Sequence, residues 1–234
     1  EGFRHVAWND AAALESAVDP SVAAVLIEAV QGEGGVRPAG AGYMAAARRI
    51  CDERNALLIV DEVQTGLGRT GRWFAHQHYD VRPDVVTMAK ALGNGVPIGA
   101  CWATEEAAAA FVPGDHATTF GGQPLAAAAA LATLQVMEAE DVAARAARAG
   151  ERLAAGLRRL GGVADVRGLG LLVAAELRDA AEEGKGAAPV AAAALAEGLV
   201  VNAVTDGALR LAPSLLVSDE EIDEALAILA RVVG

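Results

Sequence analysis

The sequence predicts an α/β fold: a mostly parallel sheet covered by helices, followed by a smaller α+β domain at the C-terminus. Continuous apolar runs at 22–29, 56–60 and 85–89 are separated by helical patterns, which is typical of parallel strands buried on both faces. After a long Ala-rich helical stretch, the chain returns to short strands that alternate with a helix.

Two helical patterns lie between and after the predicted strands of the sheet. Residues 42–55 form an amphipathic pattern between the first two strands, which predicts a helix on the sheet. Residues 124–160 are almost purely helical, and Gly161 and Gly162 end the pattern. We place the boundary between the two domains, 1–137 and 138–234, within this long helix near Met137.

The C-terminal domain is predicted to be compact. Ser218 and Glu221 form the pattern of a capping box before the final apolar run, so a helix should begin there, with the acidic cluster 219–224 at its N-terminus. The other elements are expected as strands at 163–167, 169–177, 199–204 and 209–212, a helix at 189–197 and an exposed turn at 182–186.

Composition narrows the class of protein. Apolar residues make up 53% of the 234 residues but aromatic residues only 4%, so the core must consist of Ala, Val and Leu. The net charge of −12 disfavours nucleic acid and anionic membrane surfaces as partners, and no apolar run is long enough to span a membrane. Cys51 and Cys101 match no metal or redox spacing, which fits a reducing compartment, and we expect a cytoplasmic protein.

Charged residues follow two of the predicted strands directly. Asp61 and Glu62 end the strand 56–60, and Lys90 ends the strand 85–89, before a Gly-rich segment. Ligands bind beyond the carboxyl ends of parallel strands, where an uncharged lysine amine can attack a carbonyl group. A lysine and a carboxylate on neighbouring strands are the pair that pyridoxal phosphate (PLP) requires, one at each end of its ring.

Several motifs carry a family resemblance. They are LIEAVQGEGG at 26–35, ALLIVDEVQTGLGRTG at 56–71, PDVVTMAKALGNGVPIGA at 83–100 and TTFGGQPLA at 118–126. Together with VRGLGLL at 166–172 and LRLAPSLLVSDEEI at 209–222, they resemble the class III PLP-dependent aminotransferases, most closely the acetylornithine and succinylornithine aminotransferases. The resemblance implies the aspartate-aminotransferase-like fold type I, with the large-domain sheet incomplete in this chain.

The resemblance assigns residues to the cofactor. Lys90 is expected to hold PLP as a Schiff base and to shuttle the proton between substrate and cofactor. Asp61 is expected to keep the pyridinium nitrogen protonated. Val63 would pack on the ring and Gln64 would bind near its phenolic oxygen, with Glu62 beside them among the cofactor-binding residues.

Other roles concern the substrates and a second subunit. The resemblance implies a homodimer in which Thr119 binds the cofactor phosphate across the interface, with Thr118 near the substrate. Glu33 and Arg210 would form a switchable pair: Arg210 binds the carboxylate of the amino acceptor, and Glu33 occupies the arginine when a different substrate is present. A guanidinium fork matches a carboxylate with two hydrogen bonds.

The implied reaction moves the terminal amino group of N-acetylornithine to 2-oxoglutarate and gives the semialdehyde and glutamate, as in arginine biosynthesis. Alternatives in the class are ornithine aminotransferase, 4-aminobutyrate aminotransferase and an aminomutase. The family's Gly-Thr phosphate cup, its stacking aromatic residue and a substrate-reading arginine are not found in this sequence. We therefore expect an N-terminal part to be missing and this chain alone to be inactive. A non-catalytic fragment derived from an aminotransferase remains a further alternative.

Two other motifs receive a structural interpretation. Residues 66–71 match GxGxxG, the pattern of an NAD-dependent oxidoreductase, but five residues separate them from the strand and bulky residues follow, so we expect a tight loop. His76 and His78 have no third ligand nearby, so we expect them to be solvated and predict no metal site. Cys51 is expected to be a small core residue.

Overall fold

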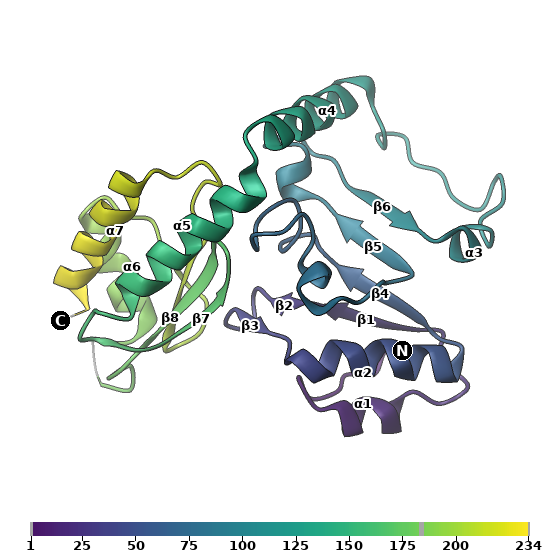
Figure 1. The fold of residues 1–234 in the computed structure, drawn as a ribbon, viewed down its shortest axis with the longest axis horizontal. Coiled ribbons are helices and arrows are strands. Elements are labelled where there is room, and N and C mark those ends of the chain that lie inside the picture. The colour runs from purple at the N-terminus through teal and green to yellow at the C-terminus, as the bar shows by residue number, and fades with distance from the viewer. Residues whose placement is uncertain (1, 183–184, 234) are drawn as a thin grey trace. The chain divides into compact units, whose positions relative to one another are not determined.

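The computed structural model describes residues 2–182 and 185–233 and divides into two compact units (Figure 1). The predicted boundary near Met137 lies close to the last crossing between the units, which falls between Glu140 and Asp141. Two segments of the predicted first domain, however, belong to the second unit. The first unit holds Glu1–Ala29, Ala39–Leu67 and Phe74–Glu140, and the second holds Val30–Pro38, Gly68–Trp73 and Asp141–Gly234.

The first unit is built on a four-stranded sheet in the order β1-β4-β5-β6. β1, β4 and β5 are parallel, as predicted, and β6 is antiparallel to β5. The sequence analysis did not predict β6, whose short apolar run of four residues follows directly on the Gly-rich segment and is half exposed. The strand bounds are Ala24–Glu28 for β1, Leu57–Asp61 for β4, Val85–Met88 for β5 and Ala100–Ala103 for β6.

Helices cover one face of this sheet. α2 (Ala41–Arg54) packs on β1 and β4, and α1 (Ala11–Ala17) packs on α2 (Figure 1). Met44, Ile50 and Cys51 of α2 are fully buried in this core, so Cys51 is the small core residue that was predicted. Burial raises the pKa of its thiol to about 11. The unit also contains the 3-10 turns η1 (Ala75–Tyr79) and η2 (Lys90–Leu92) and the helices α3 (Glu105–Ala108) and α4 (Pro124–Ala139).

The predicted long helix is two helices. α4 ends at Ala139 and α5 (Val142–Leu157) begins after Asp141, whose φ of 46° interrupts the helical backbone. An aspartate tolerates this left-handed conformation better than most residues, so the break needs no glycine or proline to mark it. Among residues 2–182 and 185–233, no helix has both the length and the apolar character that crossing a lipid bilayer requires.

The second unit is an antiparallel sheet in the order β7-β8-β10-β9. Its strands are β7 (Val163–Leu169), β8 (Leu172–Leu177), β10 (Ala208–Leu211) and β9 (Asn202–Ala203), and its other helices are α6 (Ala187–Ala196) and α7 (Asp219–Val232). The predicted capping box of Ser218 and Glu221 begins α7. The predicted turn at 182–186 includes residues 183 and 184, which lie outside the described residues.

The two faces of this sheet carry different partners. Val173 and Ala175 of β8 belong to the core shared with α5 and α7. Leu172 and Ala174 alternate with them and therefore face the other side. There they pack against the hairpin formed by β2 (Val30–Gln31) and β3 (Arg37–Pro38).

The segment Gly68–Trp73 is fixed to the second unit by Arg69. Its Nη1 donates to the carbonyl oxygens of Leu171 at 3.1 Å and Pro213 at 2.7 Å. Burial lowers the pKa of this guanidinium to about 10. Because the guanidinium satisfies two backbone acceptors inside the unit, the loop that follows β4 leaves the first unit and returns to it at Phe74.

Candidate active site

Asp61 and Lys90 lie at one edge of the first unit's sheet. Asp61 is the last residue of β4 and is level with Thr87 on the neighbouring parallel strand β5. Lys90 follows the end of β5 after one residue, Ala89. The carboxyl ends of parallel strands meet at the same edge, so the two residues that the sequence singled out stand at the same edge of the sheet.

The backbone at Lys90 is unusual. Its φ of 44° lies in the left-handed region, at the first residue of the 3-10 turn η2. A non-glycine residue in this conformation costs about 1–3 kcal/mol, and such strain gathers at functional sites. The local geometry at Lys90 therefore supports a functional role that its sequence position alone could not.

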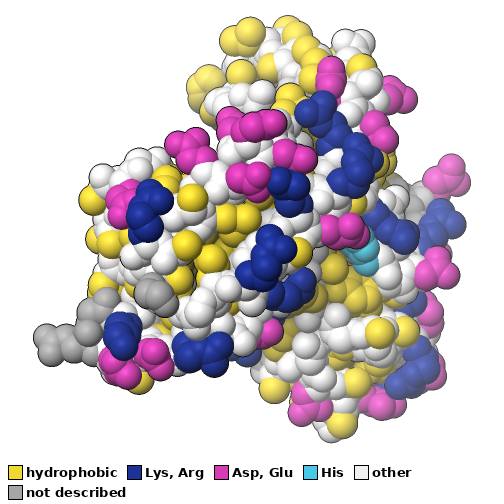
Figure 2. Space-filling view, turned by 60° about the vertical axis from the view of Figure 1, so that its left-hand side comes forward, with side chains coloured by type: hydrophobic (Ala, Val, Ile, Leu, Met, Phe, Trp, Pro, Cys, Tyr) yellow, Lys and Arg dark blue, Asp and Glu magenta, His cyan; other side chains and the backbone are white. Residues whose placement is uncertain are grey.

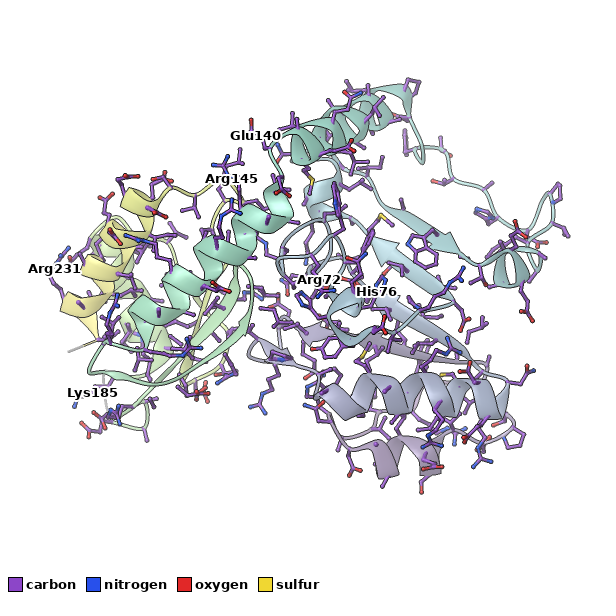
Figure 3. All side chains as sticks on the ribbon, in the orientation of Figure 1. Arg72, His76, Glu140, Arg145, Lys185 and Arg231 are labelled. Atoms are coloured by element: carbon purple, nitrogen blue, oxygen red, sulfur yellow. The ribbon has the colours of Figure 1, made fainter. Side chains whose placement is uncertain are left out.

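Only two lysines occur in the whole sequence, Lys90 and Lys185. Lys185 is exposed on the second unit, where its Nζ lies 2.7 Å from Glu182 and 3.8 Å from Asp179 (Figure 3). The Lys90 amine, by contrast, forms no hydrogen bond or ion pair with any residue in the described part of the chain. Lys90 is also exposed in this chain, not buried. Chemistry that requires a lysine therefore has one candidate with an uncommitted amine.

The carboxylate of Asp61 is oriented by the backbone two residues further along the chain. Its Oδ1 accepts a hydrogen bond from the N–H of Val63 at 2.8 Å, and its Oδ2 has no partner within the described residues. Level with it on β5, the hydroxyl of Thr87 is buried and lacks a hydrogen-bond partner in the same ranges. A buried orphan hydroxyl is uncommon and points to a group that is bound there. Beside Lys90, these groups fit a cofactor that carries both an aldehyde and a basic ring nitrogen.

Glu62 has a different environment from Asp61. Its carboxylate is fully buried and accepts hydrogen bonds from the Thr65 hydroxyl, from the N–H groups of Ala75 and His76 at 3.0 and 2.9 Å, and from His76 Nδ1 at 3.1 Å. Glu62 thus holds together the two ends of the loop that follows Asp61. Its predicted contact with the cofactor finds no support in this geometry.

The expectation that His76 is solvated was wrong. His76 is buried within the first unit, stacked on Phe74 with ring centroids 5.6 Å apart and bonded to Glu62 (Figure 3). No local pattern indicates this contact, since Glu62 and His76 are separated by 13 intervening residues of loop. The bond to a buried carboxylate replaces the water that an exposed imidazole would bind.

Val63 and Gln64 begin a series of turns that continues to Thr70. Both are partly exposed, next to Asp61. The GxGxxG run at 66–71 lies in this loop and opens no helix, in agreement with the tight loop that was expected. At Gly66 a Cβ atom would lie 2.9 Å from the carbonyl oxygen of Glu62, so this position requires glycine for close packing.

Thr118 and Thr119 lie in the stretch between α3 and α4. Every residue from 111 to 125 is exposed, and neither threonine forms a hydrogen bond within the described residues. The segment carries the apolar side chains of Phe111, Val112 and Phe120 at its surface. Nothing in the first unit covers it.

In the second unit, Glu33 and Arg210 meet across 177 positions of sequence. Arg210 Nη1 donates to Glu33 Oε1 at 2.6 Å and to the carbonyl oxygen of Gly32 at 3.1 Å. The arginine side chain is 14% exposed, whereas the glutamate side chain is 75% exposed. The carboxylate of Glu33 is therefore open to water, whereas the guanidinium of Arg210 is mostly covered.

Arg167 is a residue that the sequence reasoning missed. It lies on β7, and its Nε donates to the carbonyl oxygen of Gly35, in the same turn as Glu33, at 2.8 Å. Its Nη1 donates to Glu176 on β8 at 2.7 Å. The motif VRGLGLL contains it, but no local pattern indicates which distant turn an arginine on a strand will bind.

Known proteins with similar sequences and structures indicate the family of this chain. Residues 4–233 match the family described as Aminotransferase class-III. The acetylornithine aminotransferase of Corynebacterium efficiens is 51% identical over 217 residues, which are 92% of this chain and 52% of that protein. Among solved structures, the ornithine aminotransferase of Toxoplasma gondii is 37% identical with a TM-score of 0.92, covering all of this chain and 56% of that one. The N-acetylornithine aminotransferase of Stenotrophomonas maltophilia is 40% identical with a TM-score of 0.89, covering 99% and 62%.

The chain spans little more than half the length of the curated relatives it matches. The fold is that of the PLP-dependent aminotransferases of fold type I, as the resemblance implied, and pyridoxal phosphate is the cofactor that the family uses. With the match extending over nearly every residue, the chain belongs to the class-III aminotransferases.

Proposed function

We propose that this chain supplies the reactive lysine, the ring-directed carboxylate and the carboxylate-binding arginine of a PLP-dependent aminotransferase. The observation that carries the proposal is the placement of Asp61 and a strained, uncommitted Lys90 at the ends of neighbouring parallel strands. The donor we propose is N-acetylornithine, with 2-oxoglutarate as the amino acceptor.

The roles follow from the chemistry of the residues. PLP supplies an aldehyde that condenses with amines and a ring that withdraws electrons when its nitrogen is protonated. Lys90 would hold the cofactor through its amine, and that amine would carry the proton that is moved at the substrate carbon. Asp61 holds a proton on the ring nitrogen by its negative charge. Val63 and Gln64, close to Asp61 in the chain, would contact the ring and its phenolic oxygen.

The proposed role of the Glu33–Arg210 pair is to serve two different substrates in turn. Arg210 binds a carboxylate of the amino acceptor, because its guanidinium is held by the Gly32 carbonyl and offers a fork to a planar anion. Glu33 occupies Arg210 when the other substrate is present. The proposal is supported by the 2.6 Å contact and by the exposure of Glu33.

The donor is proposed from the relatives, several of which are acetylornithine aminotransferases at 44–51% identity. The ornithine aminotransferases among the structural neighbours make ornithine the second candidate. The test is to supply the full-length gene product, loaded with PLP, with acetylornithine, succinylornithine, ornithine and 4-aminobutyrate. A kcat/KM for acetylornithine below those of the other three amines would overturn the proposal that it is the donor. Absence of activity with all four amines would favour a non-catalytic role.

A homodimer is the proposed assembly, with Thr119 reaching the partner's cofactor phosphate and Thr118 near the substrate. It is supported by the apolar surface of the first unit, where Leu125, Leu131 and Val136 of α4 are 76%, 58% and 52% exposed. Figure 2 shows hydrophobic side chains at the surface over α4, at the top of the view. Patches of this kind mark protein interfaces. Light scattering on the full-length gene product tests it: a monomer would contradict the proposal, and Leu131→Glu should shift a dimer toward monomer.

A further inference from the structure

Two arginines hold the turn that carries Glu33. Arg167 on β7 and Arg210 on β10 are both level with Ala174 of β8, one on each side. Side chains level with each other across a sheet lie on the same face, which is the face that the β2–β3 hairpin covers. Arg210 binds the carbonyl oxygen of Gly32, and Arg167 binds the carbonyl oxygen of Gly35.

The backbone is strained directly after the contact with Arg167. Val36 has a φ of 50°, a conformation that a β-branched residue rarely adopts, and it is fully buried. Gly35 has a φ of 97°, and a Cβ atom there would lie 3.2 Å from Arg167 Nη2. Strained backbone persists only where its surroundings over-determine it, so the turn depends on the contacts that surround it.

The contact of Arg210 with this turn is the one that catalysis would disturb. The same Nη1 group serves both Gly32 and Glu33, so a substrate carboxylate that displaces Glu33 also competes for the hydrogen bond that holds the turn. The contacts of Arg167 involve neither Glu33 nor Arg210. They run to Gly35 and to Glu176, whose carboxylate orients the guanidinium, and a longer ion pair of 4.0 Å joins Arg167 to Asp165.

We infer that Arg167 is a positioning residue for substrate exchange. It keeps the Gly32–Gly35 turn on the sheet while Arg210 releases Glu33 and binds a substrate carboxylate, so that Glu33 can return. This inference rests on the proposed function of the Glu33–Arg210 pair and assigns Arg167 no contact with substrate or cofactor.

The test compares the two half-reactions in the full-length gene product loaded with PLP. Glu33→Gln removes the competitor for Arg210 and should lower the ratio of donor to acceptor kcat/KM. Arg167→Met should lower the same ratio by about fivefold, but by less than about twofold in a Glu33→Gln background, because the two changes act through one contact. Arg167→Lys keeps the positive charge beside Glu176 but has one nitrogen instead of three to donate hydrogen bonds. Its ratio of donor to acceptor kcat/KM should lie between those of Arg167→Met and the unmutated protein.

Arg178→Met is the matched control. Arg178 also binds two backbone carbonyls in the second unit, those of Gly161 at 3.1 Å and Val163 at 3.0 Å, but neither belongs to the hairpin. Arg178→Met should leave the ratio of donor to acceptor kcat/KM unchanged. Hydrogen exchange supplies a readout apart from activity: Arg167→Met should speed exchange of the amides at 32–36 by about tenfold, and Arg178→Met should not.

The outcomes separate the two claims. If Glu33→Gln leaves the ratio unchanged, the switch itself fails, and the inference fails with it. If Glu33→Gln shifts the ratio and Arg167→Met does not, only the inference is overturned. An equal effect of Arg167→Met in both backgrounds, or one matched by Arg178→Met, would reduce Arg167 to a general structural contact.

Discussion

The two units of the chain treat their charged groups in opposite ways. In the first, Lys90 has no ionic partner within the described residues and its backbone is strained. In the second, Arg210 is mostly buried and already bound to Glu33 and Gly32. The amine of Lys90 in the first unit therefore has no hydrogen-bond partner among the described residues, whereas the guanidinium of Arg210 in the second unit is hydrogen-bonded.

Chemistry explains the difference. A lysine that must act as a nucleophile and a base has to lose its proton, and a carboxylate partner would stabilise the charged form. An arginine that must recognise a carboxylate keeps its charge throughout. A glutamate carboxylate can therefore occupy it in the absence of substrate and keep its guanidinium oriented. The comparison therefore predicts that mutations in the first unit affect the rate of chemistry and those in the second affect substrate choice.

Lys90→Ala should have the largest effect. Without the amine, both half-reactions should slow by at least about 10³-fold, because nucleophile and proton carrier are lost together. Stopped-flow absorbance of the full-length gene product measures this. Lys185→Ala is the control and should change the rate by less than about twofold, since it removes only exposed ion pairs. Borohydride should attach the cofactor to the peptide that contains residue 90, and attachment at residue 185 would refute the assignment.

Asp61→Asn should come next, with a loss of about 10²-fold in kcat, as expected when one pre-oriented charge is removed from a reacting centre. The amide keeps the size of the side chain and an acceptor for the Val63 N–H, so folding should be preserved. Asp52→Asn, which alters an exposed carboxylate on α2, serves as the control. Equal rates for the two variants would show that Asp61 does not act on the cofactor.

Arg210→Lys tests the second unit. An ammonium group keeps the charge but loses the fork, so the KM for 2-oxoglutarate should rise about tenfold, or ~1.4 kcal/mol, while kcat changes little. The KM for the donor should stay within about twofold. A fall in kcat for both half-reactions, with unchanged KM, would place Arg210 in the chemistry and remove the contrast between the units.

Ser218→Ala should give the smallest effect. It removes the hydroxyl that caps α7 and should lower the free energy of unfolding by about 1 kcal/mol, measured by urea titration. Glu221→Gln keeps an acceptor for the Ser218 N–H and should cost less. Because neither change touches Arg210, the ratio of the two half-reactions should stay constant, and a changed ratio would mean that substrate choice follows general stability of the second unit.

Local pattern predicted much of the fold and part of the site. β4 was expected at 56–60 and runs from Leu57 to Asp61, because a continuous apolar strand between helices is a strong signal. Asp61 and Lys90 followed from the same reasoning, since strand ends in a parallel sheet share an edge. The scarcity of lysine was a further signal in the sequence, and it would have singled out Lys90 more sharply.

Contacts between distant segments could not be predicted from local pattern. The meeting of Glu33 with Arg210 was expected only from the family resemblance, and the contacts of Glu62 with His76 and of Arg167 with Gly35 were not expected at all. Each depends on which segments pack together, and that is decided by burial of whole elements. The assignment of 30–38 and 68–73 to the second unit was missed for the same reason.

The division of the chain has a consequence for recombination between relatives. The polypeptide passes from one unit to the other five times, after Ala29, Pro38, Leu67, Trp73 and Glu140. A chimaera joined once at Glu140 would take Arg167 and Arg210 from one parent and the Glu33 hairpin from the other. The Glu33–Arg210 pair and the arginine beside it could then be exchanged intact only by transplanting 30–38 and 68–73 together with the C-terminal stretch, as three inserts and not one.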